Sequence, residues 1–411
     1  MKGLERNAAL ARRGVFLSVA VLAAVWNPSI GSTQQPDPAE QRVPVGGRWS
    51  AEAVGQLVKV IESARAEGLD PSAYNLVGLR QVAENGQGPA LDAVADAAAV
   101  QLAHDYYFGR VSDRDDMGWM IQRPAYEPQE LAKGLQQAIA SGEIRKFYAS
   151  LLPSDPRYAA LREALAQTDD PSLRDRLRVN MERWRWMPRG LGDDYLYVNV
   201  PSYKLQVMTD GASVASYDVV VGAPKTRTPM LASPTNSFVV NPWWNVPASI
   251  VKSSNLRPGK GGYQFKASAN GGYAVRQPPG PRNALGKIKF NLANDQAIYL
   301  HDTPAKSAFG RDERALSHGC IRVKNIDQLA AQLLGEDGGD TAQFDEALAS
   351  PATATLRLPR TWQVYIVYFT LDGNDPTNLA SYSDPYGYDA QILTRLDSRP
   401  IGRAVQVAAL R

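Results

Sequence analysis

Ser317-His318-Gly319-Cys320-Ile321-Arg322 contains the only cysteine in a chain of 411 residues, and a second histidine, His301, precedes it. Two of the chain's three histidines therefore accompany its one thiol. A lone cysteine cannot form a disulfide within its own chain. A thiolate is the reactive form of cysteine, and a neighbouring imidazole or guanidinium stabilises it. The pattern therefore indicates a nucleophilic cysteine.

The segment around the cysteine predicts how its side chains are presented. We expect residues 317–323 to be extended, with His318, Cys320 and Arg322 on one side. On such a cationic face the thiol should ionise more readily than a free one. Arg322 could alternatively bind the carboxylate of an acidic substrate. The amides of Gly319 and Cys320 are candidates for an oxyanion hole.

His301 is the preferred general base. It ends the apolar run 297–300, a predicted strand from which an imidazole can be held rigidly. The connection 302–316 is long enough to bring the chain back to Cys320 and to form a flap over the site.

Less specific interpretations compete with this one. A single cysteine is often a small buried apolar residue. His301, His318 and Cys320 could instead be three zinc ligands, but no CxxC or HExxH motif accompanies them. The chain has no GxSxG motif, and residues 280–287 do not have the spacing of a phosphate-binding loop. We assign His104 no role.

The first half of the chain has helical periodicity. Ser50 is a good N-cap, and Gly68 should end the helix that follows it. Further helices are predicted over 91–107, 130–140 and 158–177.

After about Asn180 the sequence becomes rich in strand formers. Asn325 is predicted to cap one helix in this half, over 326–334. The predicted strands cover 195–200, 204–209, 213–221, 237–240, 287–292, 297–301 and 363–370.

The N-terminus resembles an export signal. Basic residues precede an apolar stretch from Val15 to Trp26, and small residues follow at 29–31. The stretch is shorter than the roughly 20 residues of a spanning helix, so we expect cleavage rather than a membrane anchor. Arg12-Arg13 also fits twin-arginine export loosely, so the route to the periplasm is Sec or Tat. Residues 32–48, rich in proline and glycine, are predicted to be a linker.

The charge balance excludes some partners. Residues 1–31 carry a net charge of +3, which equals that of the whole chain, so the remainder is formally neutral. Nothing in this balance favours nucleic acid or an anionic membrane surface.

The motif resembles the signature of the L,D-transpeptidases with a YkuD-type catalytic domain. That signature is a histidine, a variable spacer, Ser or Thr, His-Gly-Cys and then Arg or Asn two residues on; here the spacer has fifteen residues. The chain is similar to the large periplasmic subgroup at the segments 180–188, 221–229, 241–250, 276–286 and 299–304.

The resemblance implies an α+β chain with a helical scaffold domain over 49–179 and a mainly β catalytic domain, a YkuD-like β-sandwich, over 180–390. Residues 391–411 would be a tail.

The resemblance also implies that the enzyme cleaves the bond between the third and fourth residues of a peptidoglycan stem tetrapeptide through a Cys320 thioester. Transfer to a neighbouring stem would give a 3-3 crosslink. No cofactor or metal is implied, and carbapenems are expected inhibitors.

The resemblance also implies residue roles. His301 would be the base, with the carbonyl of Asp302 orienting its ring. His318 and Gly319 would shape the site around the nucleophile. Substrate-binding residues would be Ser317, Arg322, Tyr299 and Trp244, although plain core packing is an equal alternative for the tryptophan.

Two departures leave alternatives open. No separate peptidoglycan-binding module fits before residue 180, and the capping segment between Ile250 and Arg276 is short. The acceptor could be a stem, a lipoprotein lysine, a D-amino acid or water. An L,D-carboxypeptidase or crosslink-cleaving hydrolase, a catalytically silent wall-binding scaffold, and a zinc-binding module remain alternative functions.

Overall fold

The computed structural model describes residues 49–123, 128–257, 262–267, 273–336 and 338–398. The predicted signal peptide, the whole of the predicted linker and the end of the predicted tail lie outside the described residues. The described residues belong to one compact unit. Among them, no helix combines the length and the apolar character needed to cross a membrane.

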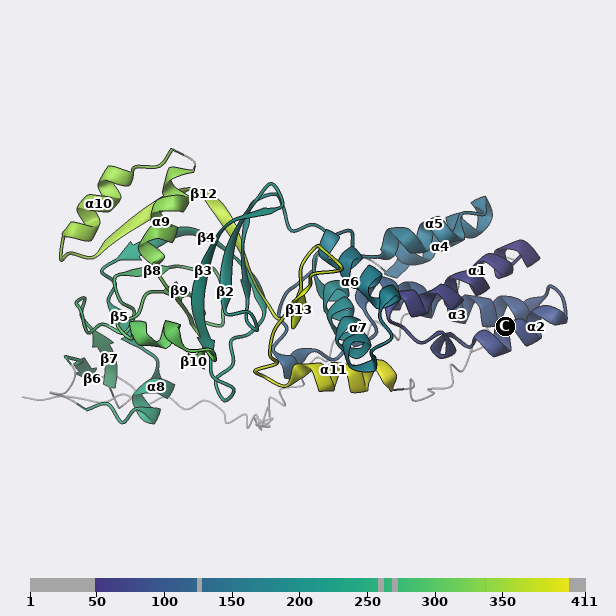
Figure 1. Ribbon diagram of the computed structural model, residues 1–411, viewed down its shortest axis with the longest axis horizontal. Helices are drawn as coiled ribbons and strands as arrows, with labels where there is room; N and C mark the ends of the chain where they lie inside the picture. The colour runs from purple at the N-terminus through teal and green to yellow at the C-terminus, as the bar shows by residue number, and fades with distance from the viewer. Residues whose placement is uncertain (1–48, 124–127, 258–261, 268–272, 337, 399–411) are drawn as a thin grey trace, which may run out of the picture. The chain divides into compact units, whose positions relative to one another are not determined.

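Helices form the N-terminal part of this unit, as the sequence predicted (Figure 1). Contacts join α1 to α3 and α5, and α4 to α3 and α5, so the apolar faces of these helices share one core. The elements are α1 (Ala51–Ser63), η2 (Ala64–Glu67), η3 (Pro71–Tyr74), α2 (Leu76–Glu84), α3 (Pro89–Phe108), η4 (Asp115–Met117), α4 (Pro128–Ser141), α5 (Ile144–Leu151), α6 (Pro156–Gln167) and α7 (Pro171–Trp186).

Local signals set the helix ends. The Ser50 side chain accepts a hydrogen bond from the amide of Ala53, and Gly68 closes η2 with a φ of +74°. The helix predicted over 158–177 is in fact two helices. Asp170 caps α7 and Pro171 occupies its first turn, where the missing amide hydrogen costs nothing.

Helix α7 continues past the predicted domain boundary at residue 180. Asn180 is buried in it, donates to Thr370 Oγ1 and accepts from the Thr370 amide, both at 2.9 Å. Arg183 of α7 forms an ion pair of 2.6 Å with Asp389. Helix α7 therefore packs with residues from near the end of the described chain.

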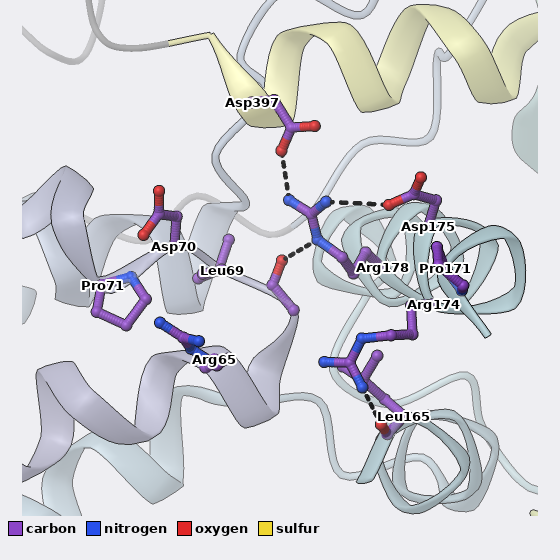
Figure 2. A pocket seen from close by; sticks show the side chains of 11 residues that line it. Arg65, Leu69, Asp70, Pro71, Leu165, Pro171, Arg174, Asp175, Arg178 and Asp397 are labelled. Carbon is purple, nitrogen blue, oxygen red and sulfur yellow. Dashed lines mark hydrogen bonds and ion pairs between the residues drawn. The ribbon is translucent and has the colours of Figure 1, made fainter. Parts of the chain in front are cut away.

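Arg178 joins three segments beside a cavity of about 420 Å³ (Figure 2). Its guanidinium donates to the carbonyl of Gly68 at 3.0 Å and contacts Asp175 at 3.3 Å and Asp397 at 2.6 Å. Arg65 also lines this cavity. The contacts of Arg178 link η2 and α7 to the last helix, α11 (Tyr388–Asp397).

The rest of the unit is mainly β, which confirms the predicted α+β class. The strands are β1 (Tyr195–Asn199), β2 (Lys204–Thr209), β3 (Ala212–Gly222), β4 (Leu231–Val240), β5 (Trp244–Val246), β6 (Gln264–Ala267), β7 (Tyr273–Gln277), β8 (Ile288–Phe290), β9 (Leu300–His301), β10 (Ala315–Ser317), β11 (Ile321–Val323), β12 (Ala354–Val367), β13 (Leu371–Asp372) and β14 (Ala380–Ser381).

Nine strands form one sheet in the order β10-β3-β11-β9-β8-β4-β12-β1-β2. Because β2 pairs with both β1 and β3, hydrogen bonding also returns from β2 to β3, and the sheet closes on itself. Closure leaves few exposed strand edges. The apolar residues of its inner side, among them Phe238, Phe290, Leu300 and Ile321, are buried in the core.

Smaller elements surround this sheet. Strands β5, β7 and β6 form a separate sheet in contact with α8 (Ala248–Ser253). Helix α9 (Ile326–Gly335) contacts β12 and α10 (Thr341–Ala349), as Figure 1 shows. Residues 306–310 form the short helix η5.

Some predicted limits need correction. Strand β9 has only two residues, and β12 begins at Ala354 rather than 363. Asn325 does precede α9, but in a left-handed conformation with no side-chain cap bond. Helix α11 begins before residue 391 and covers the first part of the predicted tail.

Candidate active site

The nucleophile loop is not extended, contrary to expectation. Strand β10 ends at Ser317, the chain bends through residues 318–320, and β11 begins at Ile321. Gly319 has a φ of +119°, a conformation that other residues adopt only with strain. The bend therefore depends on glycine immediately before Cys320.

Hydrogen bonds within the bend fix its shape. Ser317 Oγ donates to the carbonyl of Cys320 at 2.6 Å and accepts from the amide of Gly319 at 3.1 Å. The predicted use of the Gly319 amide in an oxyanion hole therefore needs correction, because that donor is already engaged. The Cys320 amide remains a candidate donor for a developing oxyanion.

The connection between β3 and β4 supports the bend from outside. The carbonyl of Ser317 accepts from the Ala223 amide at 2.9 Å and the Thr226 hydroxyl at 2.8 Å. The buried Thr228 hydroxyl donates to the carbonyl of Gly319 at 2.7 Å and accepts from the Gly222 amide at 2.8 Å. Sequence reasoning gave Thr228 no role, although its segment was part of the family resemblance.

His301 is buried at the end of β9, and the carbonyl of Asp302 holds its ring. Its Nδ1 donates to that carbonyl at 2.5 Å, which leaves the lone pair on Nε2. Burial and then the charge of Arg322 lower the pKa of His301 to about 3. The ring is therefore neutral at pH 7, in the form that can accept a proton.

The side chain of Asp302 fixes the position of this carbonyl. Its carboxylate accepts from the Lys287 amide at 2.9 Å and pairs with the ammonium of Lys306. Gly286 lies against it, because a Cβ at Gly286 would lie 2.3 Å from Asp302 Oδ2. The chain around Asp302 thus has no room for a larger residue at 286.

Cys320 is half-buried, and its thiol donates to the carbonyl of Ala297 at 3.5 Å. Burial raises the pKa of the thiol, and the amide and hydroxyl of Tyr299 oppose this rise. The charges of Lys289 and Arg322 also oppose it. The expectation that the thiol ionises more readily than a free one is therefore wrong, because desolvation outweighs the nearby cations.

Lys289, His301 and Arg322 form a row across three neighbouring strands. Lys289 of β8 is paired with His301 of β9, and His301 is paired with Arg322 of β11. Directly paired residues project to the same face of a sheet. Sequence analysis missed Lys289 because the row exists only through the strand pairing.

An aromatic cluster lies beside this row. The Tyr299 ring is 5.4 Å from the His301 ring, and the Lys289 ammonium lies 4.5 Å from the Tyr299 ring centroid. Tyr299 packs against an apolar cluster that contains Trp244. Trp243 is partly exposed, and the guanidinium of Arg276 lies 4.3 Å from the centroid of its ring.

The remaining histidines are placed differently. His318 is exposed, and His104 lies on α3 beside Asp105, where its Nδ1 is 3.2 Å from a carboxylate oxygen. Within the described ranges, no three His, Cys, Asp or Glu side chains are grouped so that they could hold a metal ion.

Two family models match separate parts of the chain. Residues 193–365 match the family model described as an L,D-transpeptidase catalytic domain, and residues 47–165 match one described as a Scaffold domain. A Haemophilus influenzae protein named "Putative L,D-transpeptidase" is 29% identical over 380 residues, covering 84% of this chain and 76% of that protein.

Two solved structures also share similarity. An L,D-transpeptidase from Mycobacterium smegmatis is 11% identical with a TM-score of 0.24, over 42% of this chain and 58% of that one. L,D-transpeptidase 1 of Mycobacterium tuberculosis is 11% identical with a TM-score of 0.21, over 43% and 61%. The chain spans about three fifths of the length of each of these structures.

Proposed function

We propose that this chain is an L,D-transpeptidase that forms 3-3 crosslinks in peptidoglycan, because residues 193–365 match the family model of that catalytic domain. The donor would be a stem tetrapeptide, cleaved between its third and fourth residues. The observation that carries the proposal is the buried, neutral His301, whose Nδ1 is held by the Asp302 carbonyl. This arrangement leaves Nε2 free to act as a base. His301 is paired with Arg322, which follows Cys320 by two residues, so the base lies on the strand next to the Cys320 loop.

The proposed reaction has two halves. His301 takes the thiol proton, and the Cys320 sulfur attacks the carbonyl carbon of the third stem residue. The carbon–nitrogen bond breaks, and the imidazolium returns the proton to the departing amine of D-alanine. An amine of a neighbouring stem then attacks the thioester and gives a proton to His301. The carbon–sulfur bond breaks, and the imidazolium returns that proton to the Cys320 sulfur. Neutral starting forms of both groups suit a proton transfer that occurs only with substrate in place.

Acylation of Cys320 is the direct test of this proposal. Intact-mass spectrometry of protein treated with a tetrapeptide donor or a carbapenem should show one adduct, and the Cys320→Ala variant should show none. Thr228→Val should slow acylation, because it removes the bond that holds the Gly319 carbonyl. Unmodified wild-type protein in a folded preparation would sink the proposal.

Product analysis separates the two halves of the reaction. Digested sacculi from cells producing the protein should contain 3-3 crosslinked dimers. Accumulation of trimmed monomers instead would show that water is the acceptor, as in a carboxypeptidase. Stems extended by a single D-amino acid, or a wall-linked lipoprotein, would identify those acceptors.

We also propose that the chain is exported to the periplasm after cleavage near residue 31. The basic residues, apolar stretch and small residues of the N-terminus support this. Sequencing the N-terminus of the protein from a periplasmic fraction tests it. A full-length N-terminus on protein retained in the cytoplasm would contradict it.

A further inference from the structure

We infer that Lys289 and Arg322 together bind a carboxylate of the donor, and that Lys289 is a specificity-determining residue of this site. The identity of the donor rests on the proposed function, whereas the preference for a carboxylate can be tested without it.

The strand pairing places both cations beside the proposed base. Lys289 and Arg322 flank His301 on its two neighbouring strands. Their Cα atoms are therefore about two strand spacings apart, roughly 10 Å. Two long side chains on one face can converge on a single carboxylate across that distance. The Lys289 ammonium lies over the ring of Tyr299, and its charge lowers the pKa of the Cys320 thiol against the effect of burial.

The row ends in apolar residues on both sides. Val239 of β4 is paired with Lys289, and Val220 of β3 is paired with Arg322. Val220 is buried against Ala308 and Phe309 of η5. No acidic side chain is therefore part of the row.

Neither cation has a counter-charge among the described residues. Within the part of the chain that the structure describes, no acidic side chain forms an ion pair with Lys289 or Arg322. The Nε–H of Arg322 is buried and donates to no hydrogen-bond acceptor among the described residues. Asp302, the acid nearest in sequence to His301, is already engaged by Lys306 and the Lys287 amide. Half-buried charges without a partner are costly, and such groups commonly receive a ligand.

The thiol does not supply the missing negative charge. Burial lowers the pKa of both Lys289 and Arg322, and the charge of Cys320 opposes this shift in each. Even with both cations present, the pKa of Cys320 stays above its usual value. The raised pKa of Cys320 means that the thiol does not offer these two side chains a stable counter-charge. An incoming carboxylate would neutralise this excess charge and ease protonation of His301 during the reaction.

A pair of alkylating reagents tests the site without any peptide. Iodoacetate carries a carboxylate, whereas iodoacetamide has nearly the same size and is neutral. The measured quantity is the second-order rate constant for iodoacetate at Cys320 divided by that for iodoacetamide. Both reagents react with the same thiolate, so differences in thiol ionisation cancel in this ratio. We expect this ratio to exceed that of a free cysteine peptide and to fall roughly 5-fold or more in Lys289→Met, since one attractive charge is lost.

Matched variants make the alkylation result specific. Lys287→Met removes the same charge from an exposed position two residues away, and it should leave the ratio unchanged. Lys289→Arg should restore most of the ratio. Thermal melting shows that each variant is folded. If Lys289→Met leaves the ratio unchanged, the inference is wrong. Equal slowing of both reagents would be such a case, and it would mean that the lysine acts only on the thiol.

Donor peptides then identify which carboxylate is bound. A tetrapeptide amidated at its terminal carboxylate, and one amidated at a side-chain carboxylate of the third residue, are compared with the unmodified donor. The recognised carboxylate is the one whose amidation lowers kcat/KM at least 5-fold in wild type and much less in Lys289→Met. Equal losses in both proteins would refute the role of Lys289. If no donor is processed, the proposed function fails while the reagent ratio still decides the carboxylate site.

Discussion

At the residue scale, the structure keeps both proposed reacting groups neutral until a substrate arrives. The pKa of His301 is about 3 and that of Cys320 lies above its usual value, in both cases chiefly because the groups are buried. A thiolate and imidazolium pair is thus not the resting state. The sequence, with a cysteine beside two histidines, had predicted a readily ionised thiol instead.

The depressed pKa of His301 predicts acid sensitivity. Its ordinary pKa near 6.5 applies in the unfolded chain, so between pH 6.5 and about 3 the unfolded state binds more protons than the folded state. The stabilising contribution is complete above pH 6.5 and is lost as the pH falls toward 3. The loss in the free energy of unfolding should reach roughly 5 kcal/mol over that window. Urea unfolding of wild type and His301→Gln at several pH values should show a shallower acid loss in the variant, and parallel curves would contradict the prediction.

Gly286→Ala should damage the site through Asp302. An added Cβ would lie 2.3 Å from the Asp302 carboxylate, and the φ of +60° at this position strains any other residue. We expect a loss of about 2 kcal/mol in the free energy of unfolding and a lower rate of Cys320 acylation. Gly310→Ala is the control, since nothing lies within 4 Å of its added Cβ. Equal acylation rates in both variants would show that the position of Asp302 does not matter.

At the element scale, the ends of helices could be predicted from the sequence, whereas the contacts between strands could not. Ser50 and Gly68 marked helix limits that the structure contains, because caps act within a few residues. The position of Lys289 beside His301 depends on which strands pair, and the bend at Gly319 depends on Thr228, which lies far away in sequence. Neither can be read from periodicity. The resemblance indicated the residues of the site but not these contacts.

Helix α7 contains a buried charge network that local periodicity does not explain. Glu182 accepts from the Val111 amide at 2.8 Å and from Trp186 Nε1 at 3.0 Å, and it pairs with Arg185 at 2.8 Å. Both charged side chains are fully buried. The pair is thus enclosed, and its partners all depend on the orientation of α7.

Glu182→Gln should therefore be strongly destabilising. Removing the negative charge leaves the buried guanidinium of Arg185 without its ion-pair partner, at a cost of about 3 kcal/mol. Glu163→Gln, an exposed change on α6, should have an effect below about 0.5 kcal/mol. Chemical denaturation of the two variants measures the difference. A small effect of Glu182→Gln would mean that other groups or water satisfy Arg185.

At the scale of the whole molecule, the helical and β regions share α7 rather than meeting at a linker. Asn180, Arg183 and Arg178 of this helix bind Thr370, Asp389 and Asp397. The described residues accordingly belong to one compact unit. A boundary placed by composition at residue 180 marks where strand-rich sequence begins, but it does not mark a break in packing.

This shared helix predicts that the two regions unfold together. Loss of α7 removes partners from both sides, so far-ultraviolet circular dichroism and tryptophan fluorescence should report one coincident thermal transition. Asn180→Ala removes the two bonds to Thr370 and should lower the free energy of unfolding by about 2 kcal/mol. Because it weakens the coupling, it should also separate the two signals. Two separate transitions in wild type would show that α7 does not couple the regions, and the same separation in the exposed variant Glu163→Gln would show that the effect is not specific to Asn180.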